Sequence, residues 1–297
     1  MSTFADWVAR SQFNKLIVRD RKTLKKVHGM ERILYGVSRL LFSIIMALPS
    51  SAAIAAASAE QEDSTVGLNV KLGYDRTNGK YDQSTNSTAS TNSVTVAYDT
   101  DDYSFDLVVP YLRQSGPGRL VAIAGQRGIV TIGPDQRASG LGDVTAGLTR
   151  YVLNEEDHGV DLDLGTVFKF HTASVSKGLG SGKSDLAIQT ALGRSFGALN
   201  TTLTLGYTFV GKPPDQGYRN AYYASMDGTF KITERVSLGI TYAAGGSIIN
   251  GLPGTRDITA NVNFKPTKKF KLNAYYSVGR STQSPDRGAG ITASRDF

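Results

Sequence analysis

The segment from Val160 to Thr172 alternates between apolar and polar residues with a period of two. The even positions carry the apolar residues Val160, Leu162, Leu164, Phe168 and Phe170, interrupted by Thr166. The odd positions carry Asp161, Asp163, Gly165, Lys169 and His171. Successive side chains of a strand point to opposite faces, so the segment predicts a strand with one apolar and one polar face. Its length suits a tilted strand that crosses a bilayer, which needs roughly ten residues.

The same alternation recurs along the chain and predicts about 12 strands. Long and short connections take turns between them, as in bacterial barrels with short periplasmic turns and longer outer loops. We expect strands at residues 65–75, 94–98, 103–111, 144–152, 160–172, 186–192, 203–209, 222–230, 236–242, 258–264, 272–278 and 289–297. The fold prediction is therefore all-β: a closed antiparallel transmembrane β-barrel with lipid outside and water inside.

Three places interrupt this regular pattern. The stretch from Thr77 to Thr91 is rich in Ser, Thr and Asn and is expected to be a loop. The connection from Gln114 to Ser139 is long enough to hold a hairpin of its own above the membrane. Pro110 cannot donate a ladder hydrogen bond, so we expect a bulge or an irregular strand end there.

A soluble β-sandwich would show the same alternation, with its apolar faces packed together. Aromatic residues near the strand ends favour the membrane barrel, because such barrels carry aromatic girdles at both interfaces. One girdle would hold Tyr74, Tyr111, Phe170, Phe209 and Tyr242, and the other Tyr98, Tyr103, Phe230 and Phe264. The chain ends in Phe297, on the apolar parity of its last expected strand. A terminal aromatic residue resembles the signal that the barrel assembly machinery reads, so we predict that machinery as a partner.

The first 59 residues read as a leader. Arg32 and Arg39 precede an apolar run from Leu40 to Ala47, and small residues follow up to Ala59. That order is typical of a secretory signal peptide. We therefore expect a signal peptide at 30–59 and the outer-membrane β-barrel at 60–297. Residues 1–29 are expected to be either sequence upstream of a true start at Met30 or an extended basic region of the leader.

The net charge of +7 does not indicate a nucleic-acid partner. Of 33 Lys and Arg and 26 Asp and Glu, nine and three lie in residues 1–59, which leaves 24 against 23 in 60–297. The basic excess is therefore expected to leave with the signal peptide. We predict no nucleic-acid binding, and localisation to the outer membrane of a Gram-negative bacterium.

The polar parity of the strands would line the lumen. Its charged members near the path of a solute are the predicted pore residues: Lys71, Asp106, Asp143, Asp163, Lys169, His171, Asp185 and Asp227. Charges of both signs in a narrow tube could select solutes, or could form ion pairs that hold the barrel round. A lone His171 without a second His or Cys does not make a metal site, so we predict neither metal nor cofactor.

Basic residues outnumber acidic ones in the predicted outer loops. They could attract the phosphates of lipopolysaccharide, which we favour, or could guide anionic solutes towards the mouth. Outer-membrane lipid, lipopolysaccharide and a small-molecule solute are the remaining predicted partners.

Three short motifs are similar to those of a known group: Pro110-Tyr111, Gly140-Leu141-Gly142-Asp143 and Gly206-Tyr207. From about Tyr103 to Phe297, the chain resembles the outer-membrane family named for the meta-pathway of phenol degradation. The resemblance implies a transporter or channel for small aromatic or otherwise hydrophobic molecules, with no catalytic residues to carry over.

We expect passive diffusion through a narrow polar lumen, and no enzymatic activity. An outer-membrane enzyme is the first alternative, either a phospholipase or a protease. A phospholipase would need Ser and His on the lipid-facing surface, and for a protease His171 with Asp185 is the one candidate pair. A structural or adhesive barrel is the second alternative, with Gln114 to Ser139 as its contact surface.

Overall fold

The computed structural model describes residues 66–213 and 217–297. The predicted segments 1–29 and 30–59, and the first residues of 60–297, lie outside the described residues. The strands are β1 (Gly67–Gly79), β2 (Ser87–Asp99), β3 (Tyr103–Ile123), β4 (Gln126–Leu141), β5 (Thr145–Leu153), β6 (Asp161–Lys169), β7 (Asp185–Phe196), β8 (Leu199–Phe209), β9 (Ala221–Thr233), β10 (Val236–Gly245), β11 (Arg256–Thr267), β12 (Phe270–Gly279) and β13 (Arg287–Asp296).

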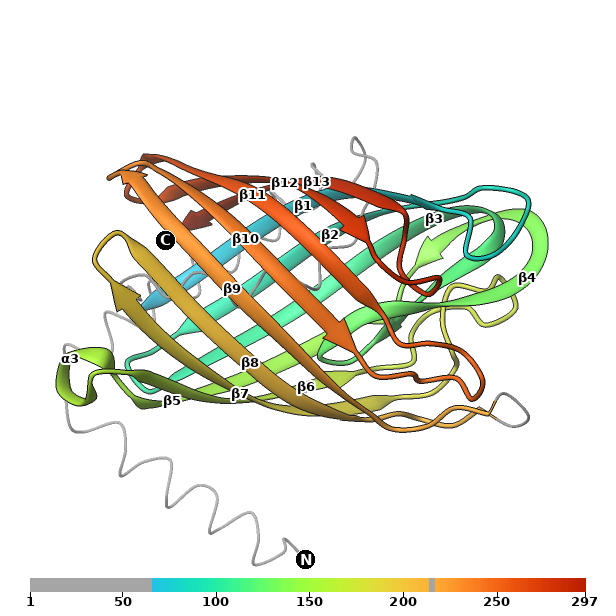
Figure 1. Cartoon of the computed structure of the whole chain (residues 1–297), viewed down its shortest axis with the longest axis horizontal. Helices are drawn as coiled ribbons and strands as arrows, with labels where there is room; N and C mark the ends of the chain where they lie inside the picture. Colours follow the sequence, from blue (N-terminus) through green and yellow to red (C-terminus); the bar gives the residue numbers. More distant parts are fainter. Residues whose placement is uncertain (1–65, 214–216) are drawn as a thin grey trace, which may run out of the picture. The chain divides into compact units, whose positions relative to one another are not determined.

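These strands form one closed antiparallel sheet (Figure 1). Each strand pairs with its neighbours in the chain, except that β3 pairs with β5 along its first part. The ring closes where β1 pairs with β13. β4 pairs only with β3 and does not take part in closing the ring. The remaining 12 strands form the barrel. The predicted strand number and closure are confirmed, and closure leaves the ring without the exposed edge that a bilayer does not tolerate.

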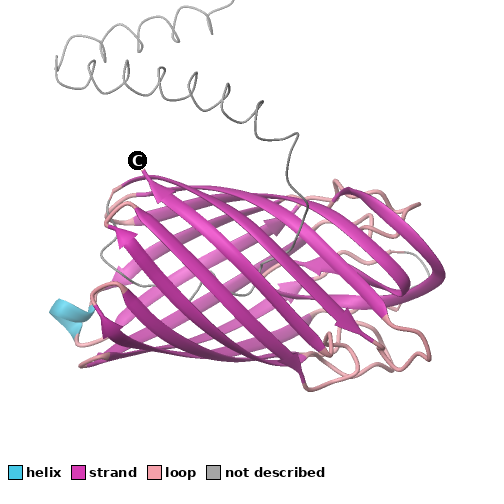
Figure 2. Ribbon diagram, turned by 90° about the horizontal axis from the view of Figure 1, so that it is seen from above, coloured by secondary structure: helices cyan, strands magenta, loops and turns pink. Residues whose placement is uncertain are grey.

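The apolar parity of the strands faces outwards. On β6, Leu164 and Phe168 are exposed on the barrel exterior, whereas Gly165 and Lys169 are buried in the interior. Exposed apolar and buried polar side chains alternate in the same way along the other strands. The strands are tilted relative to the long axis of the barrel (Figure 2). A protein whose large aliphatic and aromatic side chains cover its exterior and whose interior holds Thr, Ser, Asn and Asp is built for lipid outside and water inside.

The two ends of the barrel differ. Short turns join β2 to β3, β7 to β8, β9 to β10 and β11 to β12, and a four-residue helix, α3 (Glu155–His158), occupies the β5–β6 turn. Phe297 lies at this end, where its backbone N–H donates to the carbonyl of Leu68. The long connections lie at the opposite end, which we call the outer mouth by the rule that outer loops are the longer ones. In the described ranges, no helix is long and apolar enough to cross a membrane.

Pro110 lies at the point where β3 changes partner. Its neighbours pair with β5 up to Val108 and with β4 from Tyr111 onwards. The carbonyl of Pro110 accepts a hydrogen bond from the N–H of Gly142, in the gap between β4 and β5. The nitrogen of a residue in an antiparallel strand faces the same side as its carbonyl, so the missing N–H of Pro110 falls in that gap. The predicted irregularity is therefore a change of partner.

The predicted loop from Thr77 to Thr91 is mostly strand. β1 continues to Gly79 and β2 begins at Ser87, with paired residues throughout the extension. This stretch lacks an apolar face because it rises beyond the hydrocarbon core of the bilayer, so its outer face does not meet acyl chains. The polar composition therefore reflects an environment outside the hydrocarbon core and not the absence of a strand. Thr is itself a residue that favours strands.

Candidate functional site: the lumen and the hairpin tip in its outer mouth

The hairpin formed by β3 and β4 turns its end into the barrel. We call residues Val121–Gln126 the hairpin tip. The hydroxyl of Thr208, on the inner wall of β8, donates to the carbonyl of Ala124 over 3.0 Å, and the side-chain amide of Gln126 lies 3.3 Å from the same hydroxyl. The predicted hairpin between Gln114 and Ser139 exists. Its tip bends inwards and contacts the inner wall near the outer end of β8.

The tip fits the wall too closely to admit an additional carbon atom. Gly125 has a φ of 73°, a left-handed conformation that favours glycine. A Cβ atom at Gly125 would overlap the hydroxyl of Tyr223 and the side chain of Ala187. Tyr223 is itself held by a hydrogen bond of 2.7 Å to Gln189 on β7. The turn of the hairpin therefore fills the space between β7 and β9.

Apolar side chains seal the tip against the outer loops. Val121 and Ile123, at the end of β3, are 2% and 0% exposed. They pack against Val210 and Tyr218 of the β8–β9 connection and against Ile248 of the β10–β11 connection. Among the described residues, this cluster is an apolar zone inside a mouth whose wall is otherwise mostly polar.

Lys169 connects the wall to the tip. Its ammonium group lies 3.0 Å from Asp185 and 3.4 Å from Asp143, and all three side chains are fully buried. It also donates to the carbonyl of Ala122, at 3.1 Å, and to the hydroxyl of Ser181, at 3.1 Å. One ammonium group therefore holds β6, β7, the approach to β5, the β6–β7 loop and the hairpin tip.

The two carboxylates are held by backbone amides as well. Asp143 accepts a hydrogen bond of 2.9 Å from the N–H of Ala173, and Asp185 accepts one of 2.9 Å from Gly211. The N–H of Ala124 in the hairpin tip also donates to Asp185. A buried charge is tolerated only when ion pairs and hydrogen bonds satisfy it, and here each charged group has both.

The predicted pore residues fall into three groups. Asp143, Lys169 and Asp185 meet in the ion-paired cluster just described. Asp227 is buried lower in the wall, where the hydroxyls of Ser225 and Thr241 donate to it. Lys71, Asp106 and Asp163 face the lumen on other strands and are only partly buried. Asp163 lies six residues before Lys169, roughly 20 Å closer to the periplasmic end.

His171 does not lie with the buried residues. β6 ends at Lys169, and the imidazole two residues later is exposed at the rim of the mouth. Its Nδ1 lies 2.8 Å from the hydroxyl of Ser184. Within 66–213 and 217–297, no group of three or more His, Cys, Asp or Glu side chains could hold a metal ion.

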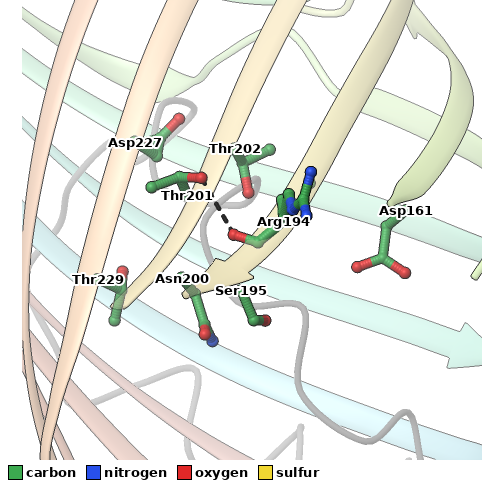
Figure 3. A pocket seen from close by; sticks show the side chains of 9 residues that line it. Asp161, Arg194, Ser195, Asn200, Thr201, Thr202, Asp227 and Thr229 are labelled. Carbon is green, nitrogen blue, oxygen red and sulfur yellow. Dashed lines mark hydrogen bonds between the residues drawn. The ribbon is translucent and has the colours of Figure 1, made fainter. Parts of the chain in front are cut away.

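A small cavity lies on the inner wall near the periplasmic end (Figure 3). Asp161, Asn200 and Asp227 are among its lining residues, and the hydroxyl of Thr201 donates to the backbone carbonyl of Arg194, whose side chain lies over Phe196 on the exterior. Its volume is about 20 Å³. A water molecule needs roughly 10–15 Å³ by this measure, so the cavity suits water and excludes an organic solute.

Sequence reasoning missed the residues of the hairpin tip that contact the wall. Ala122, Ala124 and Gly125 act through backbone atoms or lack of size, and no pattern in the sequence distinguishes them. The apolar run Leu120 to Ala124, in a connection predicted to stand in water, was the one available signal. This apolar run is explained by the burial of Val121 and Ile123 against the outer loops.

The geometry can be compared with known proteins. The translocator domain of the autotransporter NalP from Neisseria meningitidis is 14% identical, covering 93% of this chain and 98% of that one, with a TM-score of 0.47. The toluene transporter TodX of P. putida is 13% identical, covering 84% and 96%, with a TM-score of 0.44. The toluene transporter TbuX of Ralstonia pickettii is 11% identical, covering 84% and 96%, with a TM-score of 0.45.

A comparison with curated protein sequences found no match. A family model does match, over residues 56–297, which is most of the chain and all of the barrel. The chain therefore belongs to the outer-membrane family described as "Putative MetA-pathway of phenol degradation".

Proposed function

We propose that this protein is an outer-membrane channel through which small aromatic or otherwise hydrophobic molecules diffuse passively, and that the hairpin tip controls access to its lumen. The family description supports the aromatic class, because phenol is an aromatic compound. The apolar exterior and polar interior support a path across the outer membrane.

The observation that carries the proposal is the apolar zone at the hairpin tip. A solute that passes the mouth must displace or slide past Val121, Ile123 and Ile248, which are almost completely buried. A strongly hydrated solute would lose hydrogen bonds to water there, at a cost of a few kcal/mol for each unpaired group. An aromatic solute loses little and gains apolar contact. The constriction therefore favours hydrophobic molecules.

A reversible crosslink tests this function. The sequence contains no cysteine, so Ala124→Cys with Ala187→Cys introduces the only pair. Ala124 in the tip and Ala187 on β7 belong to one packed cluster. We expect the oxidised double variant in liposomes to take up phenol more slowly than its reduced form, and each single variant to be insensitive to reductant. Equal phenol uptake by the oxidised and reduced double variant, with the disulfide verified by mass, would contradict control by the tip.

Substrate class needs a separate measurement. Uptake of phenol and of a neutral sugar of similar size should be compared in liposomes that contain the wild-type barrel. We expect phenol to enter faster than in protein-free liposomes and the sugar not to do so. Faster entry of the sugar would contradict the proposed selectivity while leaving a channel.

Hydrolysis remains the alternative function, and one contact bears on it. His171 and Ser184 form an exposed hydrogen-bonded pair at the rim. A catalytic triad also requires a carboxylate that orients the imidazole. In the described part of the chain, no carboxylate hydrogen-bonds to His171, and Asp185 is paired with Lys169. A hydrolase activity that is lost in His171→Ala would favour the enzyme.

A further inference from the structure

Three arginines gather on the outer surface of β1 to β4, beyond the aromatic girdle. In the sheet register, Arg76 lies opposite Ser90, Ser90 opposite Arg113, and Arg113 opposite Ser139. Neighbouring strands are separated by about 4.8 Å, so Arg76 and Arg113 lie roughly 10 Å apart on either side of Ser90. One row across four strands is thus formed by the side chains of Arg76, Ser90, Arg113 and Ser139.

A second row of polar residues runs directly above the first. Thr88 lies opposite Ser115, and Ser115 lies opposite Arg137. The two rows are separated by two residues along each strand, or about 7 Å. Together they line an open groove of about 420 Å³, which we call the arginine groove. Arg76, Arg113 and Arg137 are exposed in it.

The position of the arginine groove is set by the row beneath it. Two residues closer to the membrane, Tyr74, Asn92, Tyr111 and Leu141 follow one another in the same register. Tyr74, Tyr111 and Leu141 are exposed on the exterior, and the guanidinium of Arg113 lies 5.9 Å from the ring centroid of Tyr111. Tyrosines on the exterior of a barrel mark the interface between hydrocarbon and headgroups. The arginine groove therefore lies at the depth of the outer-leaflet headgroups.

The positive charge of the groove has no internal counterpart. Among the side chains that the structure describes, no carboxylate forms an ion pair with Arg76, Arg113 or Arg137. Guanidinium groups bind phosphate through paired N–H donors, and the hydroxyls of Ser90, Thr88 and Ser115 add further donors. Three unpaired guanidinium groups around hydroxyls form a set of donors that suits a phosphate.

We propose that the arginine groove binds the phosphate groups of a phosphorylated glycolipid in the outer leaflet, with the acyl chains of that lipid lying along the exterior below. The rings of Tyr74 and Tyr111 and the side chain of Leu141 provide the apolar surface for those chains. A free phosphate would not use that surface, whereas a lipid uses both parts. This inference concerns the exterior wall and does not depend on what passes through the lumen.

The structure offers a matched control for the test. Arg150, Arg194 and Arg295 are also exposed, and each lies over an exterior aromatic ring, of Tyr103, Phe196 and Phe297 respectively. These rings belong to the opposite, periplasmic rim of the barrel. Replacing these three arginines changes the net charge by the same amount at the wrong depth.

The experiment measures lipid binding to the full barrel in detergent micelles by native mass spectrometry. The probes are diphosphorylated lipid A, the same lipid after enzymatic dephosphorylation, and inorganic phosphate as a competitor. We expect wild-type protein to bind diphosphorylated lipid A at least about tenfold more tightly than the dephosphorylated lipid. Arg76→Gln/Arg113→Gln/Arg137→Gln should lose that preference, and Arg150→Gln/Arg194→Gln/Arg295→Gln should keep it.

Each other result overturns the proposal. Equal binding of both lipids by wild type means that acyl chains alone are recognised. Equal loss in the control variant means that net charge, and not the groove, attracts the lipid. Full displacement of the lipid by inorganic phosphate at equal concentration means a site for free phosphate. If the triple variant does not show the heat-modifiable band of a folded barrel, Arg113→Gln alone decides, and unchanged lipid preference there contradicts the proposal.

Discussion

The ammonium group of Lys169 lies 3.1 Å from the carbonyl oxygen of Ala122. One residue belongs to the barrel wall and the other to the hairpin tip, 47 positions earlier in the chain. Because the same ammonium group pairs with Asp143 and Asp185, the charge balance of the wall and the position of the tip depend on one side chain.

Replacing Lys169 with methionine should destabilise the barrel and release the tip. Two buried carboxylates would lose their shared cation, and removing one partner of a buried ion pair costs about 3–5 kcal/mol. We expect a lower free energy of unfolding in urea and a higher single-channel conductance. Lys177→Met, at an exposed lysine of the β6–β7 loop, is the control and should change neither quantity.

Removing all three charges separates the effect of unpaired charge on stability from the effect of losing the contact between Lys169 and the hairpin tip. In Lys169→Met/Asp143→Asn/Asp185→Asn no unpaired charge remains, so we expect the triple variant to be more stable than Lys169→Met alone. Its conductance should stay high, because the hydrogen bond to Ala122 is still absent. A triple variant less stable than the single one would show that unpaired carboxylates are not the cause of the loss.

Gly125→Ala should displace the tip without unfolding the barrel. The added methyl group would overlap Tyr223 and Ala187, and the positive φ of Gly125 adds about 1 kcal/mol of strain. Within β3 only residues up to Ser115 pair with the ring strands β2 and β5, so displacing the tip leaves those hydrogen bonds in place and the protein should still migrate as a folded barrel. Faster hydrogen exchange at Val121–Gln126 is the expected readout. Gly251→Ala is a matched control, because Gly251 also has a positive φ but open space around its Cβ position.

Tyr218 should give the folded protein a dependence on alkaline pH. It lies in the β8–β9 connection, where burial and then the negative charge of Asp185 raise the pKa of its hydroxyl from 10.0 to about 12. The folded state therefore holds its proton between these pH values while the unfolded chain loses it. The free energy of unfolding should be unaffected by this group below pH 10 and should fall as pH rises towards 12.

Tyr218→Phe isolates that effect. The free energy of unfolding of wild type relative to the variant should be constant below pH 10 and should fall above it. A pH-independent difference, measured by urea unfolding, would show that the hydroxyl of Tyr218 titrates alike in both states.

Phe297 is predicted to act in assembly and to matter less for the finished fold. Its ring is 49% exposed on the exterior, under the guanidinium of Arg295, and its N–H still bonds to Leu68 when the side chain is changed. Phe297→Ser should reduce the amount of folded barrel in outer membranes of expressing cells. Refolding of the purified variant in detergent should proceed as in wild type, and an equal defect there would contradict a role as assembly signal.

The ring could be predicted from the sequence because the polarity of each strand residue depends on whether its side chain faces lipid or the lumen. Leu164 and Phe168 must face lipid and Asp163 and Lys169 must not, so the period of two is visible without knowing any partner. Exceptions arise where the surroundings change. Thr77 to Thr91 looked like a loop because its outer face does not meet hydrocarbon and its buried inner face is also mostly polar, so no apolar parity is visible. Pro110 looked like a defect because one strand alone does not show the gap between its partners β4 and β5.

The alternation of side chains therefore determined a barrel and its two faces, since these follow from local pattern and from the solvent on each side. Only the tertiary structure decided that the β3–β4 hairpin bends into the mouth, that Lys169 meets Asp143, Asp185 and Ala122, and that three arginines line one groove. Those features depend on strand register and on contacts between residues far apart in the chain, and a shift of one residue in pairing would move every side chain to the other face.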